Sequence, residues 1–333
     1  MQKLFKPGLA FLFCFFLLTG CGIPKPETPV TPDGYTVTDY EGNQVYIPHK
    51  PKRIITAQLA FDTILLGIVP SDHAVAVNVL SKDPMGSFIA GEVKDIRYTI
   101  PPGGHISTSL IMKAKPDLLI LTDYIDKNTV EMIRSLGYPV VICKSPDSHR
   151  EIMDAVTLIA KAVGEPEKGD KLIRKIQSDL SEIDKKLSEI HAEIPVGLLV
   201  SQMQSYGGPG SMYHENLVRA RIRNGIEKAG LKDGEYLSKE MVLKSDPDFF
   251  LVAADRPVDT RKTNRYKREF LADPVVQTMK GRHNVVAVPS RYIYCGNQNC
   301  GWAIKALANA AYGPIYGELF DMSDEHFIRA DDL

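Results

Sequence analysis

The most constraining feature of this sequence is one long amphipathic segment, residues 167–190, that separates two blocks of short apolar runs. At 1.5 Å per residue a helix of this length reaches about 35 Å. Pro166 precedes the segment and Pro195 follows it, which marks both ends. We predict a rigid helix joining two lobes; a surface helix packed on one lobe is the alternative. Its apolar residues recur every three or four positions, the period of a helix with one buried face: Leu172, Ile176, Leu180, Ile183, Leu187 and Ile190.

Short apolar runs alternate with helical patterns on both sides of this segment. Strands that alternate with helices favour parallel βα units whose sheet is covered on both faces. A β-hairpin is expected over 35–48, around a Gly turn. The fold class is therefore α/β, with two lobes built on mainly parallel central sheets. The expected strands are 53–56, 74–77, 118–121, 140–142, 196–200, 248–252 and 284–288.

A short internal repeat links the two blocks. Residues 112–121 and 243–252 both read as a helix end, then Pro-Asp, then a buried strand. Proline disfavours helix in the residue before it and so enforces the stop. The repeat supports two lobes of one design.

The N-terminus has the pattern of an export signal. Lys3 and Lys6 precede an apolar run over 9–18, and the small residues Thr19 and Gly20 precede Cys21. The run is shorter than the roughly 20 residues needed to span a bilayer. The ending resembles the bacterial lipobox, in which the Cys thiol is acylated; an ordinary signal peptide that ends in Cys is the alternative. We expect a signal over 1–20 and a lipidated Cys with a stiff Pro-rich spacer over 21–34.

Composition and cysteine usage narrow the partners. A formal net charge of −1 gives no global field for nucleic acid, and we expect none to bind. Export permits disulfides, so Cys295 and Cys300 are a disulfide candidate; free or metal-binding thiols are the alternative. Cys143 ends an apolar strand and is expected to be buried.

The chain resembles bacterial substrate-binding lipoproteins of the ferric-siderophore, haem and vitamin B12 uptake class. The resemblance covers nearly all of residues 35–315. It rests on the order and spacing of several short stretches: Thr38–Gly42, Ile47–Ile55, Lys115–Ile120, the long helix, and Phe270–Pro274.

The resemblance implies a ligand cleft between the two lobes, and it also implies partners and docking residues. Proteins of this class deliver ligand to an ABC permease and its ATPase, and an acidic residue on each lobe meets permease arginines. Glu215 falls where the second-lobe acid is expected. Ungapped counting for the first-lobe Glu lands on Ser109, which leaves that contact open, and Asp62 matches another acid of the class. A surface ion pair is worth only about 0–1 kcal/mol, so these acids would set orientation more than affinity.

Loops that follow strands supply the candidate ligand-binding residues. In the second block these are Tyr206 in a Gly-rich loop, Arg256, and the alternating pair Tyr292 and Tyr294. Arg256 could grip an anionic chelate, and a salt bridge with a nearby Asp is its alternative. The tyrosines could stack on a macrocycle or, for Tyr294, ligate haem iron; core packing is the alternative for at least one of them.

The first block offers Tyr98 and His105 at the matching positions. His105 could be an axial ligand for iron or cobalt, although a lone His is more often a solvated loop residue. The eight His show no paired spacing, so we expect no site for a bare metal ion and no intrinsic cofactor.

We therefore predict a monomeric, lipid-anchored, extracytoplasmic solute-binding protein, not an enzyme, whose ligand is a metal chelate. Ferric siderophore ranks first, haem second and cobalamin third. A lipid-anchored sensor, or a redox or metal-cluster enzyme on the same scaffold, is the alternative of another class; no nucleotide-binding fingerprint supports an enzyme. The predicted divisions are an N-terminal lobe over 35–165, the linking helix over 166–193, a C-terminal lobe over 194–320 and an acidic tail over 321–333.

Overall fold

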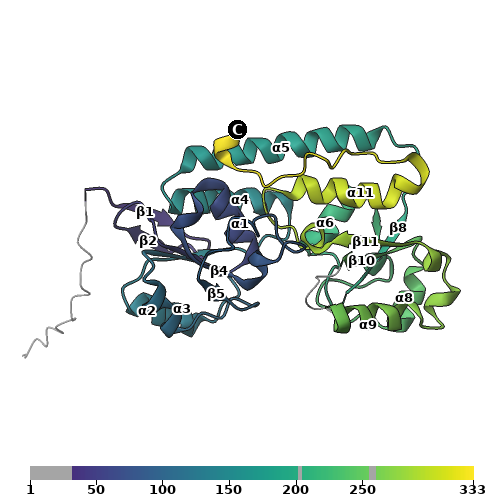
Figure 1. Ribbon diagram of the computed structural model, residues 1–333, viewed down its shortest axis with the longest axis horizontal. Helices are drawn as coiled ribbons and strands as arrows, with labels where there is room; N and C mark the ends of the chain where they lie inside the picture. The colour runs from purple at the N-terminus through teal and green to yellow at the C-terminus, as the bar shows by residue number, and fades with distance from the viewer. Residues whose placement is uncertain (1–31, 202–204, 255–259) are drawn as a thin grey trace, which may run out of the picture.

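The computed structural model describes residues 32–201, 205–254 and 260–333. It contains two α/β lobes beneath one long helix (Figure 1), and each lobe is built on a parallel sheet. The predicted fold class is confirmed. Cys21, the predicted signal and most of the spacer lie outside the described residues. Within those residues, no helix is both long enough and apolar enough to cross a membrane.

The sheet of the N-terminal lobe has five parallel strands in the order β5-β4-β3-β6-β7. Alternate residues of β6 enter two different cores: Leu118 and Ile120 pack with one cluster, Leu119 and Leu121 with the other. A strand buried on both faces reads as a continuous apolar run, which is why the sequence revealed it. The strands are β3 (Ile54–Thr56), β4 (Ala74–Asn78), β5 (Tyr98–Ile100), β6 (Leu118–Thr122) and β7 (Val140–Cys143).

Helices cover both faces of this sheet. Helices α1 (Leu59–Ile68) and α4 (His149–Ala162) cover one face, and α2 (Thr108–Ala114) and α3 (Lys127–Ser135) cover the other (Figure 1). A hairpin of β1 (Tyr35–Thr38) and β2 (Gln44–Ile47) flanks the lobe, and 3₁₀ turns lie at Ser71–His73 and Val79–Lys82.

The C-terminal lobe repeats this design on four parallel strands in the order β11-β10-β8-β9. The strands are β8 (Val196–Val200), β9 (Arg223–Asn224), β10 (Phe249–Ala254) and β11 (Val285–Pro289). The helices are α6 (Met212–Arg219), α7 (Gly225–Lys228), α8 (Lys239–Ser245), α9 (Thr260–Leu271), α10 (Ser290–Ile293) and α11 (Cys300–Tyr316), with 3₁₀ turns at Val276–Thr278, Lys280–His283 and Ala330–Asp332. The short edge strands β5 and β9 were not predicted.

The Asp of the Pro-Asp repeat makes the same kind of backbone contact in both lobes. The Asp117 carboxylate accepts hydrogen bonds from the backbone N–H groups of Lys52 and Arg53, each 2.9 Å long. The Asp248 carboxylate likewise accepts from the Val196 N–H at 2.7 Å. Each Asp therefore fixes the start of the neighbouring strand, β3 or β8, and sets the register of its sheet.

The long helix α5 (Pro166–Ser188) packs on α4 of the N-terminal lobe and on α11 of the C-terminal lobe. Figure 1 shows it lying along both lobes. The predicted apolar face is the buried one, from Leu172 to Leu187. A helix held at both ends resists bending, because bending would break its own hydrogen bonds and its packing.

The C-terminal segment, residues 317–333, returns from α11 to the N-terminal lobe and ends against the first part of α5 (Figure 1). Asn299 Nδ2 donates to the carbonyl of His326 at 2.9 Å, and Lys168 Nζ lies 2.8 Å from Asp331 Oδ1. The segment is thus a strap packed across the two lobes.

Candidate ligand-binding cleft

A cleft of about 640 Å³ lies between the two lobes, beyond the carboxyl ends of their strands. This is where open α/β sheets expose the loops that bind ligands. The N-terminal lobe contributes Gln58, Asn78, Tyr124, Ser145 and Asp147, which lie at or just after the ends of β3, β4, β6 and β7. The C-terminal lobe contributes Ser201, Tyr206, Asp233, Lys267, Ser290 and Tyr294.

Two predicted tyrosines form one wall of the cleft. The rings of Tyr206 and Tyr294 are 5.1 Å apart at an angle of 41°, a tilted contact within the favourable range for aromatic pairs. The Tyr206 hydroxyl donates to the Ile293 carbonyl at 3.3 Å. Burial is the main cause that raises the pKa of both phenols. Both are therefore neutral hydrogen-bonding groups with an apolar face.

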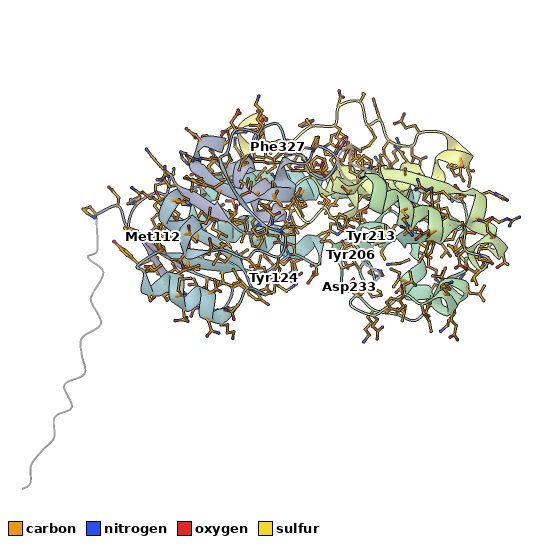
Figure 2. All side chains as sticks on the ribbon, turned by 60° about the horizontal axis from the view of Figure 1, so that its bottom comes forward. Met112, Tyr124, Tyr206, Tyr213, Asp233 and Phe327 are labelled. Carbon is orange, nitrogen blue, oxygen red and sulfur yellow. The ribbon has the colours of Figure 1, made fainter. Side chains whose placement is uncertain are left out.

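A fixed loop carries Tyr206. The Asp233 Oδ1 accepts from the backbone N–H groups of Gly207 at 2.7 Å and Gly208 at 3.3 Å. Gly207 has φ +105°, and a Cβ on Gly208 would lie 2.4 Å from the carbonyl carbon of Lys232. Only glycine tolerates this conformation and this close approach. Figure 2 shows Tyr206 and Asp233 on one side of the space between the lobes and Tyr124 on the other.

The cleft has mixed electrostatics. Leu59 and Met212, the first residues of α1 and α6, line it, as does Asp147 just before α4, and helix N-termini favour negative charge. Lys267 adds a buried ammonium that donates to the Ala253 carbonyl. The carboxylates of Asp147 and Asp233 oppose this field. The arrangement suits a polar ligand held by hydrogen bonds and aromatic contacts.

The structure corrects the expectation for Asp62. Its side chain is fully buried, and its carboxylate accepts hydrogen bonds from the Thr56 and Ser81 hydroxyls and the Asn78 N–H. Burial raises the pKa of this carboxyl to about 7, against the three hydrogen bonds, which lower it. Asp62 lies on the face of α1 that meets the ends of β3 and β4, so it cannot meet a permease.

Glu215 keeps its predicted exposure. It lies in the first turn of α6 with 42% of its side chain exposed, and its Oε2 is 3.7 Å from Nδ1 of His149 in the N-terminal lobe. The docking role remains a prediction.

Tyr292 does not face the cleft. Residues 290–293 form the short helix α10 instead of an extended strand, so Tyr292 and Tyr294 point to different sides. The Tyr292 hydroxyl donates to Glu325 Oε2 at 2.5 Å, which fastens the C-terminal strap. The prediction that both tyrosines bind ligand was wrong for Tyr292.

The first-block candidates are also outside the cleft lining. Tyr98 is half-buried on the edge strand β5, with the Arg97 guanidinium 5.5 Å from its ring centre. His105 is exposed beside Gly103, which does line the cleft. Arg256 falls outside the described residues.

The expected disulfide is not formed. Cys143, Cys295 and Cys300 are buried free thiols. The loop between Cys295 and Cys300 is held by Asn297 instead, whose Oδ1 accepts from the Asn299 N–H at 3.0 Å and from the Cys295 thiol at 3.6 Å. Among the residues that the structure describes, no group of three or more His, Cys, Asp or Glu could hold a metal ion.

Several residues that line the cleft were not identified from the sequence. Gln58, Asn78, Tyr124 and Ser145 each follow a predicted strand within a few positions, so applying the strand-end rule to every strand would have found them. Lys267 and Asp233 come from elsewhere in the C-terminal lobe and carry no local signal.

Residues 54–291 match the family described as "Periplasmic binding protein". Two Bacillus subtilis relatives are described as ABC transporter substrate-binding lipoproteins. The uncharacterised YvrC is 23% identical over 57% of this chain and 61% of its own length, and YhfQ is 24% identical over 64% and 68%. The match thus spans less than two thirds of the first relative.

Solved structures share the fold. The periplasmic heme-binding protein RhuT of Roseiflexus sp. RS-1 superposes with a TM-score of 0.67 at 20% identity, over 78% of this chain and 99% of RhuT. The Haemophilus influenzae molybdate-binding protein MolA gives 0.70 at 17% identity, over 87% and 94%.

Proposed function

This chain belongs to the periplasmic binding protein family, and from this premise we propose that it captures a metal chelate outside the cytoplasm and delivers it to an ABC import permease. The observation that carries the proposal is the cleft of about 640 Å³, lined by hydroxyls, amides and aromatic rings from both lobes. A pocket of this size accommodates a ligand of several hundred daltons.

Ferric siderophore is the first choice of ligand. The cleft offers neutral hydrogen-bond donors and aromatic faces, which suit a chelate whose metal already has its ligands. Haem is second. The fold-related RhuT binds haem, but Tyr206 and Tyr294 are phenols whose burial raises their pKa, which opposes ligation of iron as a phenolate.

Other ligands and classes rank lower. Cobalamin is the third choice within the same class. A redox enzyme would need a reactive thiolate, and burial raises the pKa of Cys143 and Cys300 to about 12. These thiols suit a packed core. A lipid-anchored sensor is distinguished by failure to stimulate the ATPase of a permease.

The proposal also includes the lipid anchor on Cys21 and an acidic residue that docks to the permease. A lipid on Cys21 and a Pro-rich spacer would hold the protein beside its permease and raise the local concentration. Glu215, exposed on α6, would meet a permease arginine.

The absorption spectrum of the protein purified from its own organism tests the ligand class. A ferric-chelate charge-transfer band is expected. A Soret band would identify the ligand as haem instead of a siderophore, and a corrin spectrum would exclude both iron ligands.

A further inference from the structure

A side pocket of about 260 Å³ adjoins the cleft within the C-terminal lobe. The two cavities share Leu199, Ser201 and Tyr206 as walls. Tyr206 therefore lines both cavities and marks where they meet. Because Asp233 fixes the loop that carries Tyr206, this junction is formed before any ligand arrives.

The side pocket has a different chemistry from the cleft. Its interior is formed by apolar side chains from β8, the loop before α8, α8 itself, α9 and the turn after α9: Leu199, Leu237, Val242, Phe270, Val275 and Val276. Leu237, Phe270 and Val275 are only partly buried, so apolar surface remains for an occupant to cover. The ion pair of Lys239 and Asp273, 2.6 Å apart, lies at the rim.

We propose that this side pocket binds an apolar arm of the same ligand whose polar head occupies the cleft. The inference rests on the proposed function for the head and adds the arm. At about 30 Å³ for each group of the size of a water molecule, the pocket holds roughly eight methylene groups. The ligand class is therefore a chelate that carries a medium-length acyl chain or a group of similar size.

The first experiment tests the pocket without any chelate. N-octanoylglycinamide is titrated into the protein, and the methyl signals of Leu237, Val242 and Val276 are followed by NMR. Selective shifts of these methyl groups are expected, and their absence would overturn the proposal. The variant Leu237→Trp fills the pocket and should abolish the shifts. Leu243→Trp adds the same side chain at an exposed position of α8 and should leave them unchanged.

The second experiment tests whether one ligand occupies the side pocket and the cleft together. Ferric desferrioxamine B is compared as its N-acetyl and N-octanoyl derivatives, which share one head. The octanoyl form should bind at least ten-fold more tightly, and Leu237→Trp should reduce the ratio to below two-fold while the acetyl form keeps its affinity. Equal affinities in the wild type would overturn the inference. If neither derivative binds, a ferric trihydroxamate is excluded as the head in the cleft, while the amide titration still decides the side pocket.

Discussion

The Nε2 atom of His149 lies 3.0 Å from the side-chain oxygen of Asn216, which joins α4 of the N-terminal lobe directly to α6 of the C-terminal lobe. An amide oxygen only accepts, so Nε2 carries the proton. Asn216 is itself fully buried and donates to the Cys295 carbonyl at 3.5 Å. This contact fixes how α4 and α6, and with them the two lobes, meet.

The lobe contact should weaken in acid. Burial lowers the pKa of His149 to about 4; the nearby Arg219 also lowers it, while Asn216 and Asp184 raise it. The unfolded value is near 6.5, so the unfolded chain binds the proton more tightly. The stability that His149 contributes is therefore lost as pH falls from about 6.5 to about 4, on the order of 3 kcal/mol in all.

Urea denaturation of His149→Gln against the wild type checks this. The variant keeps a donor but does not titrate, so the difference in unfolding free energy should change between pH 7 and pH 4.5. His191→Gln, at an exposed position, should show no such change. A pH-independent difference for His149→Gln contradicts the assignment.

Asp62 should change the stability of the protein with pH in the opposite direction. Its folded-state pKa of about 7 lies above the unfolded value of 3.8, so the folded chain holds the proton more tightly. The contribution is fully present below pH 3.8 and is lost as pH rises through about 7, on the order of 4 kcal/mol. The Asp62→Asn variant has no carboxyl group to titrate at this position, so it should not show this loss. Its denaturation midpoint, compared with that of the wild type, should therefore rise between pH 5 and pH 8. A constant difference across that range would argue for an exposed Asp62.

Asp233 should control affinity by holding the Tyr206 loop. Asp233→Ala removes the acceptor for the Gly207 and Gly208 N–H groups, and we expect at least ten-fold weaker binding of the ferric chelate by fluorescence titration. Asp233→Asn keeps an acceptor oxygen and should bind within three-fold of the wild type.

Asp248→Ala is the control for this loop. Asp248 fixes backbone at the opposite ends of the strands, so this variant should lose stability without losing affinity. Equal losses of affinity in Asp233→Asn and Asp233→Ala would mean that the charge of Asp233 contacts the ligand.

The two tyrosines of the 291–295 segment should separate function from stability. Tyr292→Phe loses the hydrogen bond to Glu325 and should cost about 1–3 kcal/mol of unfolding free energy with unchanged affinity. Tyr294→Ala should weaken ligand binding, since Tyr294 lines the cleft. Thermal denaturation and titration of both variants distinguish the roles; reversed effects would restore the original prediction for Tyr292.

The sequence predicts those parts of the fold that depend on local periodicity. The strands 118–121 and 196–200, the helix α5 and the Pro-Asp repeat all carry period or breaker signals that need no knowledge of tertiary contacts. The edge strands β5 and β9 are too short for such a signal.

The site was harder to predict because its contacts join distant segments. Asp62 was expected at the surface, as charged residues usually are. Its three hydrogen-bond donors come from Thr56, Asn78 and Ser81, and no spacing rule links them to it. Tyr292 and Tyr294 diverge because one turn of helix, too short to leave a pattern, replaces the expected strand.

The most direct test of the central claim is a titration of the protein with ferric siderophores, haem and cobalamin, in the wild type and in the double variant Tyr206→Ala/Tyr294→Ala. A ferric siderophore should bind the wild type in a 1:1 complex, more tightly than haem or cobalamin, and should lose at least ten-fold in affinity in the double variant. Tighter binding of haem, or siderophore affinity that the double variant retains, would contradict the assignment of this cleft to a ferric chelate.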